Sequence, residues 1–134
     1  MKKFKKLIFI DDDKATNFFH NIVLKQADIC EEAIFFESAQ KALEYFEELF
    51  SQEQIELPDY VFLDINMPVM NGWDFLQEFE KFQLKHPIVI IMLTTSLNKS
   101  DYDKAQDIDL IYEFWNKPLA AEKLIALTKT GERG

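Results

Sequence analysis

Residues 58–72 read PDYVFLDINMPVMNG, and this stretch carries the strongest signal for the architecture of the chain. It contains an apolar run at 60–63 that stops at Asp64, and a loop with Pro68 and Gly72 follows. A short continuous apolar run is typical of a strand that is covered on both faces. We therefore predict a buried strand at 60–63 with an acidic side chain at its carboxyl end.

Similar apolar runs lie on both sides of this stretch. They are short, nearly continuous and rich in Ile, Val and Phe, and they occupy 7–10, 34–36, 88–93, 110–112 and 114–115. The segments between them have apolar residues at helical spacing, most clearly at 39–50, where Ser38 is suited to be the N-cap. Strand and helix thus alternate five times. This order predicts an α/β fold, a doubly wound (βα)5 sandwich with a five-stranded parallel sheet of the flavodoxin-like class.

The remaining helices are less sharply marked. We expect helices at 73–82 and at 119–130, the last one stopping at Gly131, whereas the polar segment 99–108 has few apolar anchors. In the first helix, four apolar residues at helical spacing are expected to form the buried face: Phe19, Ile22, Val23 and Ala27.

Length and composition indicate one domain. The chain has 134 residues and is 48% hydrophobic, so we expect a single domain over 1–134 with a core at about 5–130 and no output domain. Its 24 acidic and 15 basic residues give a formal charge of -9, which argues against direct nucleic-acid binding. Cys30 is the only cysteine, and no apolar segment is long enough for a signal peptide or a membrane span. We therefore expect a cytoplasmic protein without membrane insertion.

Polar residues with reactive or charged side chains follow four of the five predicted strands. They are Asp11, Asp12 and Asp13 after the first, Asp64 after the third, Thr94, Thr95 and Ser96 after the fourth, and Lys117 after the fifth. The carboxyl ends of parallel strands meet at one edge of a sheet, and ligands bind where the strand order reverses. These side chains are therefore expected to converge.

Such a convergence has a defined chemistry. Carboxylates that lie close together repel one another unless a cation is present, and Mg²⁺ suits a half-open site of oxygen ligands. Lys117 and Thr94 are suited to bind anionic oxygens, as an ammonium and a hydroxyl. Together these groups predict a receptor for a phosphoryl group, with one carboxylate as the nucleophile.

Four motifs in this order resemble those of response-regulator receiver domains, in particular stand-alone domains of the chemotaxis-receiver type. They are LIFIDDD at 7–13, PDYVFLDINMPVMNG at 58–72, IIMLTT at 90–95 and NKPL at 116–119. The spacings suit the family: 52 residues from Asp12 to Asp64, 30 from Asp64 to Thr94, and 23 from Thr94 to Lys117. The resemblance covers nearly the whole chain.

The resemblance implies a phosphoacceptor and a metal site. Asp64 would be the phosphoacceptor, and Asp11 and Asp12 the acidic pair, with Asp12 the direct metal ligand and Asp11 acting through water. With Asp64 and the backbone carbonyl of Asn66 they would hold Mg²⁺, with Mn²⁺ as a possible substitute. The third acid, Asp13, leaves open a register in which Asp12 and Asp13 form the pair.

The resemblance also implies roles at the other strand ends. Thr94 and Lys117 would bind phosphoryl oxygens, and the Lys117–Pro118 peptide bond would be cis. Phe114 would be the switch aromatic, which turns inward when Thr94 moves. Asn66 and Ser96 would tune autodephosphorylation.

The function implied by the resemblance is phosphorelay signalling in a two-component system. The phosphoryl group would come from a phosphohistidine of a sensor histidine kinase or a histidine phosphotransfer protein. The resulting phosphoprotein would act on a downstream protein through the face of its fourth helix, fifth strand and fifth helix. It would not be a turnover enzyme, because it would catalyse only its own phosphorylation and autodephosphorylation.

Three alternatives stay open at this point. Asp11 and Asp13 form a DxD pattern like that of haloacid-dehalogenase-type phosphatases, although this leaves the stretch around Asp64 unexplained. A binding module that no longer uses phosphate is the second alternative. The chain could also be a fragment of a larger hybrid kinase.

Overall fold

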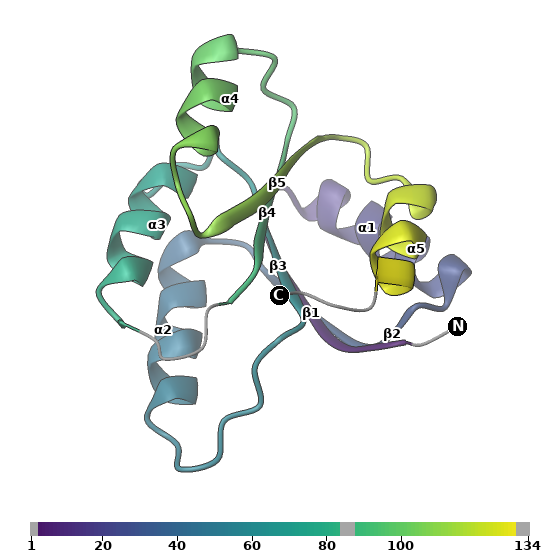
Figure 1. The fold of residues 1–134 in the computed structure, drawn as a ribbon, viewed down its shortest axis with the longest axis horizontal. Helices are drawn as coiled ribbons and strands as arrows, with labels where there is room; N and C mark the ends of the chain where they lie inside the picture. The colour runs from purple at the N-terminus through teal and green to yellow at the C-terminus, as the bar shows by residue number, and fades with distance from the viewer. Residues whose placement is uncertain (1–2, 84–87, 131–134) are drawn as a thin grey trace.

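The structure, a computed structural model, describes residues 3–83 and 88–130. Strands and helices alternate along the whole of it (Figure 1). The elements are β1 (Phe4–Ile10), α1 (Lys14–Ala27), β2 (Cys30–Phe36), α2 (Ala39–Phe50), β3 (Tyr60–Leu63), α3 (Gly72–Glu80), β4 (Ile90–Thr94), α4 (Lys99–Gln106), β5 (Ile111–Asn116) and α5 (Ala121–Thr130).

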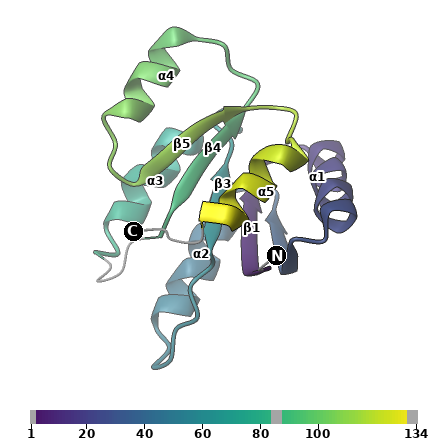
Figure 2. The ribbon, with the colours of Figure 1, turned by 45° about the vertical axis from the view of Figure 1, so that its right-hand side comes forward.

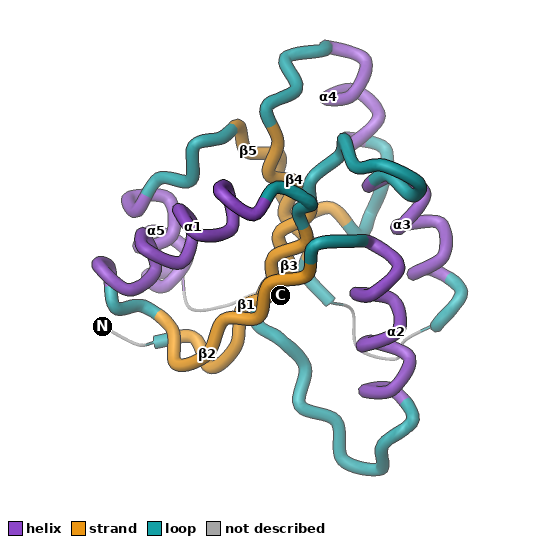
Figure 3. The backbone as a smooth tube through the Cα atoms, turned by 180° about the vertical axis from the view of Figure 1, so that it is seen from behind, coloured by secondary structure: helices purple, strands orange, loops and turns teal. Residues whose placement is uncertain are grey.

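The five strands form one parallel sheet in the order β2-β1-β3-β4-β5. Helices α1 and α5 cover one face of the sheet, and α2, α3 and α4 lie on the other (Figures 1 and 3). The predicted doubly wound (βα)5 fold is therefore confirmed. The strand order reverses between β1 and β3, so the loops after these two strands lie next to each other, and ligands bind at such a point in doubly wound folds.

The sheet separates two apolar cores. Phe46, Phe75 and Phe79 lie in the core under α2 and α3, where Phe46 and Phe79 meet edge to face with ring centroids 5.1 Å apart. Phe9 and Phe62 of adjacent strands lie in the core under α1 and α5 and stack at 4.6 Å. The stretches 7–10 of β1, 60–63 of β3 and 90–93 of β4 are continuously apolar rather than alternating, because both faces of the sheet are covered there.

The prediction for the buried face of α1 is partly wrong. Val23 and Ala27 do pack against the core, but Phe19 and Ile22 are 44% and 38% exposed. The residues that α1 buries are Asn17, His20 and Leu24. Asn17 is buried because its side-chain amide donates a hydrogen bond to the carbonyl of Asp11, at 2.8 Å. The buried side of α1 therefore differs from the one that hydropathy indicates.

Several predicted boundaries move by a few residues. Helix α3 begins at Gly72 and ends at Glu80, and α5 begins at Ala121. Strand β2 extends back to Cys30, with Glu31 and Glu32 exposed on this edge strand. The polar segment after β4 does form a helix, α4, which buries only Ala105. The predicted stop at Gly131 lies outside the described residues.

Strand β5 is the other edge of the sheet and lies between α4 and α5 (Figure 2). Among the residues that the structure describes, none of the helices combines the length and the apolar character that crossing a membrane requires.

Candidate functional site

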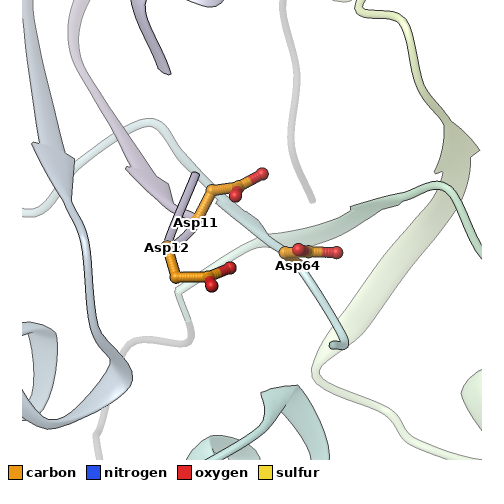
Figure 4. A group of neighbouring side chains, drawn as sticks. All are labelled: Asp11, Asp12 and Asp64. Carbon is orange, nitrogen blue, oxygen red and sulfur yellow. The ribbon is translucent and has the colours of Figure 1, made fainter. Parts of the chain in front are cut away.

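Three carboxylates meet where the strand order reverses. Asp11 and Asp12 directly follow β1, and Asp64 directly follows β3. Figure 4 shows the three side chains gathered at this edge, and one carboxylate oxygen from each lies within 4.8 Å of the others. Since Mg²⁺ and similar hard cations bind carboxylate oxygens, the arrangement fits a divalent cation.

Asp13 caps a helix instead of joining the three carboxylates. It is the N-cap of α1, where its carboxylate accepts hydrogen bonds from the backbone N–H of Ala15 at 3.2 Å and from the hydroxyl of Thr16 at 2.6 Å. The Thr16 hydrogen bond is the main cause of a lowered pKa of Asp13. The geometry thus favours Asp11 with Asp12 as the acidic pair, and it leaves the DxD reading of Asp11 and Asp13 without support.

Both carboxylate oxygens of Asp11 have a partner within the protein. The residue is buried, and its Oδ1 accepts a hydrogen bond from the backbone N–H of Asp13 at 2.9 Å. Its Oδ2 is in a short charge-assisted contact with Nζ of Lys117. Its backbone carbonyl accepts the hydrogen bond from Asn17. The carboxylate is therefore fixed before any ligand binds.

Asp64 is a buried carboxylate beside a cation. It is 7% exposed, Oδ1 accepts a hydrogen bond from the N–H of Ile65 at 2.8 Å, and Oδ2 lies 3.4 Å from Nζ of Lys117. Burial raises the pKa of Asp64 above its usual range, and the charge of Lys117 and a hydrogen bond with Thr94 partly offset this. Above that pKa, Asp64 presents a poorly hydrated anionic oxygen, as a nucleophile requires.

Thr94 and Lys117 close the other side of the site. Thr94 is the last residue of β4 and is fully buried, and its carbonyl accepts a hydrogen bond from the N–H of Lys117 at 2.8 Å. Lys117 directly follows β5, and its peptide bond to Pro118 is cis, as expected. The predicted convergence of strand-end residues is thus seen for Asp11, Asp12, Asp64, Thr94 and Lys117.

The other predicted site residues lie at the periphery. Asn66 is exposed in the loop after β3, and Ser96 is half-buried in the loop after β4. Phe114 is half-buried on β5 and meets Tyr102 of α4 edge to face, with ring centroids 5.5 Å apart. An aromatic contact therefore links the predicted switch residue to α4.

Gly72 is needed for the site although the sequence interpretation gave it no role. A Cβ at Gly72 would lie 2.5 Å from the carbonyl oxygen of Asp64, and its own N–H donates a hydrogen bond to the carbonyl of Ile65 at 2.8 Å. Only glycine allows α3 to begin this close to the acceptor loop. A signal was available, since Gly72 is the only glycine before residue 131.

Two further residues near the site were not expected there. Asp101 of α4 accepts a hydrogen bond from the hydroxyl of Ser96 at 2.7 Å, and its other oxygen lies 3.3 Å from the indole nitrogen of Trp73. The sequence motifs assigned neither residue a role in the site. Their contact joins residues 28 positions apart, which no local pattern indicates.

An open cavity of about 370 Å³ adjoins the site. It lies between the start of α1 and the loop after β5 and is lined by Ala15, Thr16, Phe19, His20, Thr95, Lys117 and Pro118. Lys117 thus borders both this cavity and the carboxylates.

Comparison with known proteins agrees with this geometry. The family model of the response regulator receiver domain matches residues 7–129. Response regulator Rcp1 of Synechocystis is 28% identical over 97 residues, which cover 72% of this chain and 66% of Rcp1. Sensor histidine kinase CheAY of Helicobacter pylori is 30% identical over 91 residues, which cover 68% of this chain and 11% of CheAY. The match thus spans just under two thirds of Rcp1 and a small part of CheAY.

Solved structures show the same fold. A two component response regulator from Cytophaga hutchinsonii has a TM-score of 0.83 and 28% identity, with 96% of this chain and 97% of that chain covered. The Mn²⁺-bound form of response regulator Rcp1 has a TM-score of 0.69 and 23% identity, with 94% and 90% covered, which is a likeness of fold. Because the family match spans most of the chain, the protein belongs to the response regulator receiver domain family, whose members act in two-component signal transduction.

Proposed function

We propose that Asp64 accepts a phosphoryl group from a phosphohistidine of a sensor histidine kinase or a histidine phosphotransfer protein. The observation that carries this proposal is the buried Asp64 carboxylate, 3.4 Å from Nζ of Lys117 and clustered with Asp11 and Asp12. The match to sensor histidine kinase CheAY, a protein of the same signalling class, supports a histidine kinase as the partner.

The acidic cluster is suited to hold Mg²⁺, and Mn²⁺ is a possible substitute. The ligands would be Asp11, Asp12, Asp64 and the backbone carbonyl of Asn66, with Asp11 acting through water. Support comes from the 4.8 Å grouping of the three carboxylates and from the Mn²⁺-bound form of the related Rcp1. When bound, the cation neutralises the charge that develops on the phosphoryl oxygens.

The protein's own residues then perform the transfer. A carboxylate oxygen of Asp64 forms a bond to phosphorus on the side opposite the histidine, and the phosphorus–nitrogen bond breaks with its electron pair going to the imidazole. Nζ of Lys117, which already faces Asp64, binds a phosphoryl oxygen as a fixed positive charge. The hydroxyl of Thr94 donates a hydrogen bond to another phosphoryl oxygen.

The output of the phosphorylated domain is proposed to be a protein contact on the face of α4, β5 and α5. Movement of Thr94 toward the phosphoryl group would be followed by Phe114, whose ring contacts Tyr102 on this face. Tyr102 of α4 and Tyr112 of β5 are 49% and 50% exposed, and Leu97 in the loop before α4 is 89% exposed, which supplies apolar surface for a partner.

Asn66 and Ser96 are proposed to set the lifetime of the phosphoryl group, as they lie two residues after Asp64 and Thr94. The chain is proposed to catalyse only its own phosphorylation and dephosphorylation rather than the turnover of phosphate esters. We also propose a cytoplasmic location, in keeping with a chain whose single cysteine cannot form an internal disulfide.

Intact mass after incubation with acetyl phosphate and Mg²⁺ tests the acceptor. We expect one phosphoryl addition to the wild type, none to Asp64→Asn, and one to the control Asp103→Asn, whose exposed carboxylate pairs only with Lys99 among the described residues. Addition to Asp64→Asn would overturn the assignment of Asp64. A wild type that gains no phosphoryl group and binds no beryllofluoride would overturn the proposed function.

A further inference from the structure

The loop between β4 and α4 is held by a chain of hydrogen bonds that begins at Thr94. The backbone N–H of Ser96 donates to Oγ1 of Thr94 at 3.2 Å. The hydroxyl of Ser96 donates to Oδ2 of Asp101 at 2.7 Å and accepts from the N–H of Asn98 at 3.2 Å. The side-chain amide of Asn116 donates to the carbonyl of Ser96 at 3.0 Å. Ser96 is therefore tied to Thr94, to α4 and to β5 at once.

The contact between Ser96 and Thr94 sets the direction of the Thr94 hydroxyl. A hydroxyl offers one donor and two acceptor positions, and here one acceptor position is taken by the N–H of Ser96. The proton of the hydroxyl is then free to point toward the Asp64 loop, because Asp64 follows β3, the strand that pairs with β4. This is the orientation that a phosphoryl oxygen on Asp64 needs.

Asp101 is in turn fixed by α3. Its Oδ1 lies 3.3 Å from Nε1 of Trp73, so both carboxylate oxygens have a donor. The ammonium of Lys104, one turn further along α4, lies 4.8 Å from the centre of the Trp73 ring. Helices α3 and α4 are neighbours on the same face of the sheet, so this contact bridges them (Figure 1).

We propose that Asp101 is a positioning residue for phosphoryl acceptance: its carboxylate, anchored by Trp73, holds Ser96 and thereby orients Thr94 toward the phosphoryl group on Asp64. This inference rests on the proposed function and extends it to a residue that touches neither the phosphoryl group nor the metal ligands. It also assigns α3 a part in the response, because loosening Trp73 loosens the Thr94 loop.

Beryllofluoride with Mg²⁺, a mimic of the phosphoryl group, is the probe. Its affinity for the full chain is measured by titration followed with amide NMR. We expect Asp101→Ala to weaken binding about threefold to tenfold, as the loss of one ordinary net hydrogen bond would. The control Asp103→Ala removes the same charge from the same helix and is expected to bind as the wild type does.

The double variant shows whether Asp101 acts through Ser96. In a Ser96→Ala background, Asp101→Ala is expected to cause no further loss, because the hydroxyl that it holds is gone. Ser96→Thr, which keeps a hydroxyl, is expected to bind more tightly than Ser96→Ala. An equal loss from Asp101→Ala in both backgrounds would show a merely structural role and overturn the proposal.

The indole N–H of Trp73 gives a second readout that is independent of affinity. We expect its NMR resonance, assigned with Trp73→Phe, to shift when beryllofluoride binds the wild type, and to shift much less in Ser96→Ala. No shift in the wild type would overturn the link to α3. If the wild type binds beryllofluoride and Asp101→Ala has the same affinity for it as Asp103→Ala, this inference alone is overturned. A wild type that binds no beryllofluoride would overturn the proposed function as well.

Discussion

At the scale of single residues, the most informative position outside the acidic cluster is His20. It is 1% exposed, its ring lies 5.2 Å from that of Phe9, and its Nδ1 has no hydrogen-bond partner among the described residues. Burial lowers the pKa of His20 to about 4. Burial, with a smaller effect of the Lys117 charge, therefore holds this imidazole neutral at pH 7, although the carboxylate of Asp11 favours its charged form.

This lowered pKa predicts a loss of stability in acid. Between about pH 6.5 and pH 4 the unfolded chain binds a proton at His20 that the folded chain does not, so stability falls as the pH falls through this window. Over this window the free energy of unfolding is expected to decrease less in His20→Phe and His20→Gln than in the wild type. The expected difference is on the order of 2–3 kcal/mol.

Urea denaturation at several pH values, with EDTA present, measures this difference. The two variants serve as controls for each other, because one keeps an aromatic ring and the other a polar side chain. Parallel pH profiles for the wild type and both variants would contradict the prediction.

At the scale of elements, α1 shows that polar contacts can set the rotation of a helix. Its sequence has apolar residues on more than one side, and the buried side includes Asn17 and His20. The N-cap at Asp13 and the hydrogen bond from Asn17 to Asp11 determine where the helix begins and which side faces the sheet. As a consequence, Phe18, Phe19 and Ile22 lie on the outside, 69%, 44% and 38% exposed.

This rotation can be tested with two variants that remove comparable side chains. Leu24 is 3% exposed in the core, so Leu24→Ala is expected to cost about 2–5 kcal/mol of the free energy of unfolding. Ile22→Ala is expected to cost less than about 1 kcal/mol, because its side chain is already partly in water. Equal costs in chemical denaturation, or a larger cost at Ile22, would show that the helix has the other phase.

At the scale of the whole molecule, the reversal of strand order between β1 and β3 brings the acidic residues together. Folding therefore works against their mutual repulsion, since the cluster forms only when the sheet does. A cation that binds the folded chain alone stabilises it by mass action.

We expect Mg²⁺ to raise the free energy of unfolding by about 1.4 kcal/mol when its concentration is about ten times the dissociation constant. Asp12→Asn is expected to lose most of this gain, because it removes a proposed ligand. Without Mg²⁺, Asp12→Asn is expected to be no less stable than the wild type, because it relieves repulsion among the carboxylates. Thermal unfolding with Mg²⁺ and with EDTA measures both effects. A gain that persists in Asp12→Asn but is lost in the control Asp103→Asn would place the cation elsewhere.

The sequence by itself determined the alternation of strands and helices, the doubly wound class and the identity of the strand-end residues. These follow from local properties: continuous apolar runs for buried strands, helical spacing between them, and a polar residue where each run stops. The direction of parallel strands then places Asp64, Thr94 and Lys117 at one edge without any coordinates.

Only the tertiary structure decided which of the three acids after β1 caps α1, which side of α1 is buried, and how Ser96, Asp101 and Trp73 connect. Asp13 leaves the cluster because it caps α1, and Asn17 is buried because it bonds to Asp11. Trp73 reaches Asp101 across 28 positions of sequence. The physical reason is the same in each case. A polar side chain has several possible hydrogen-bond partners in the sequence, and the packing of the elements determines which of them lies within hydrogen-bonding distance.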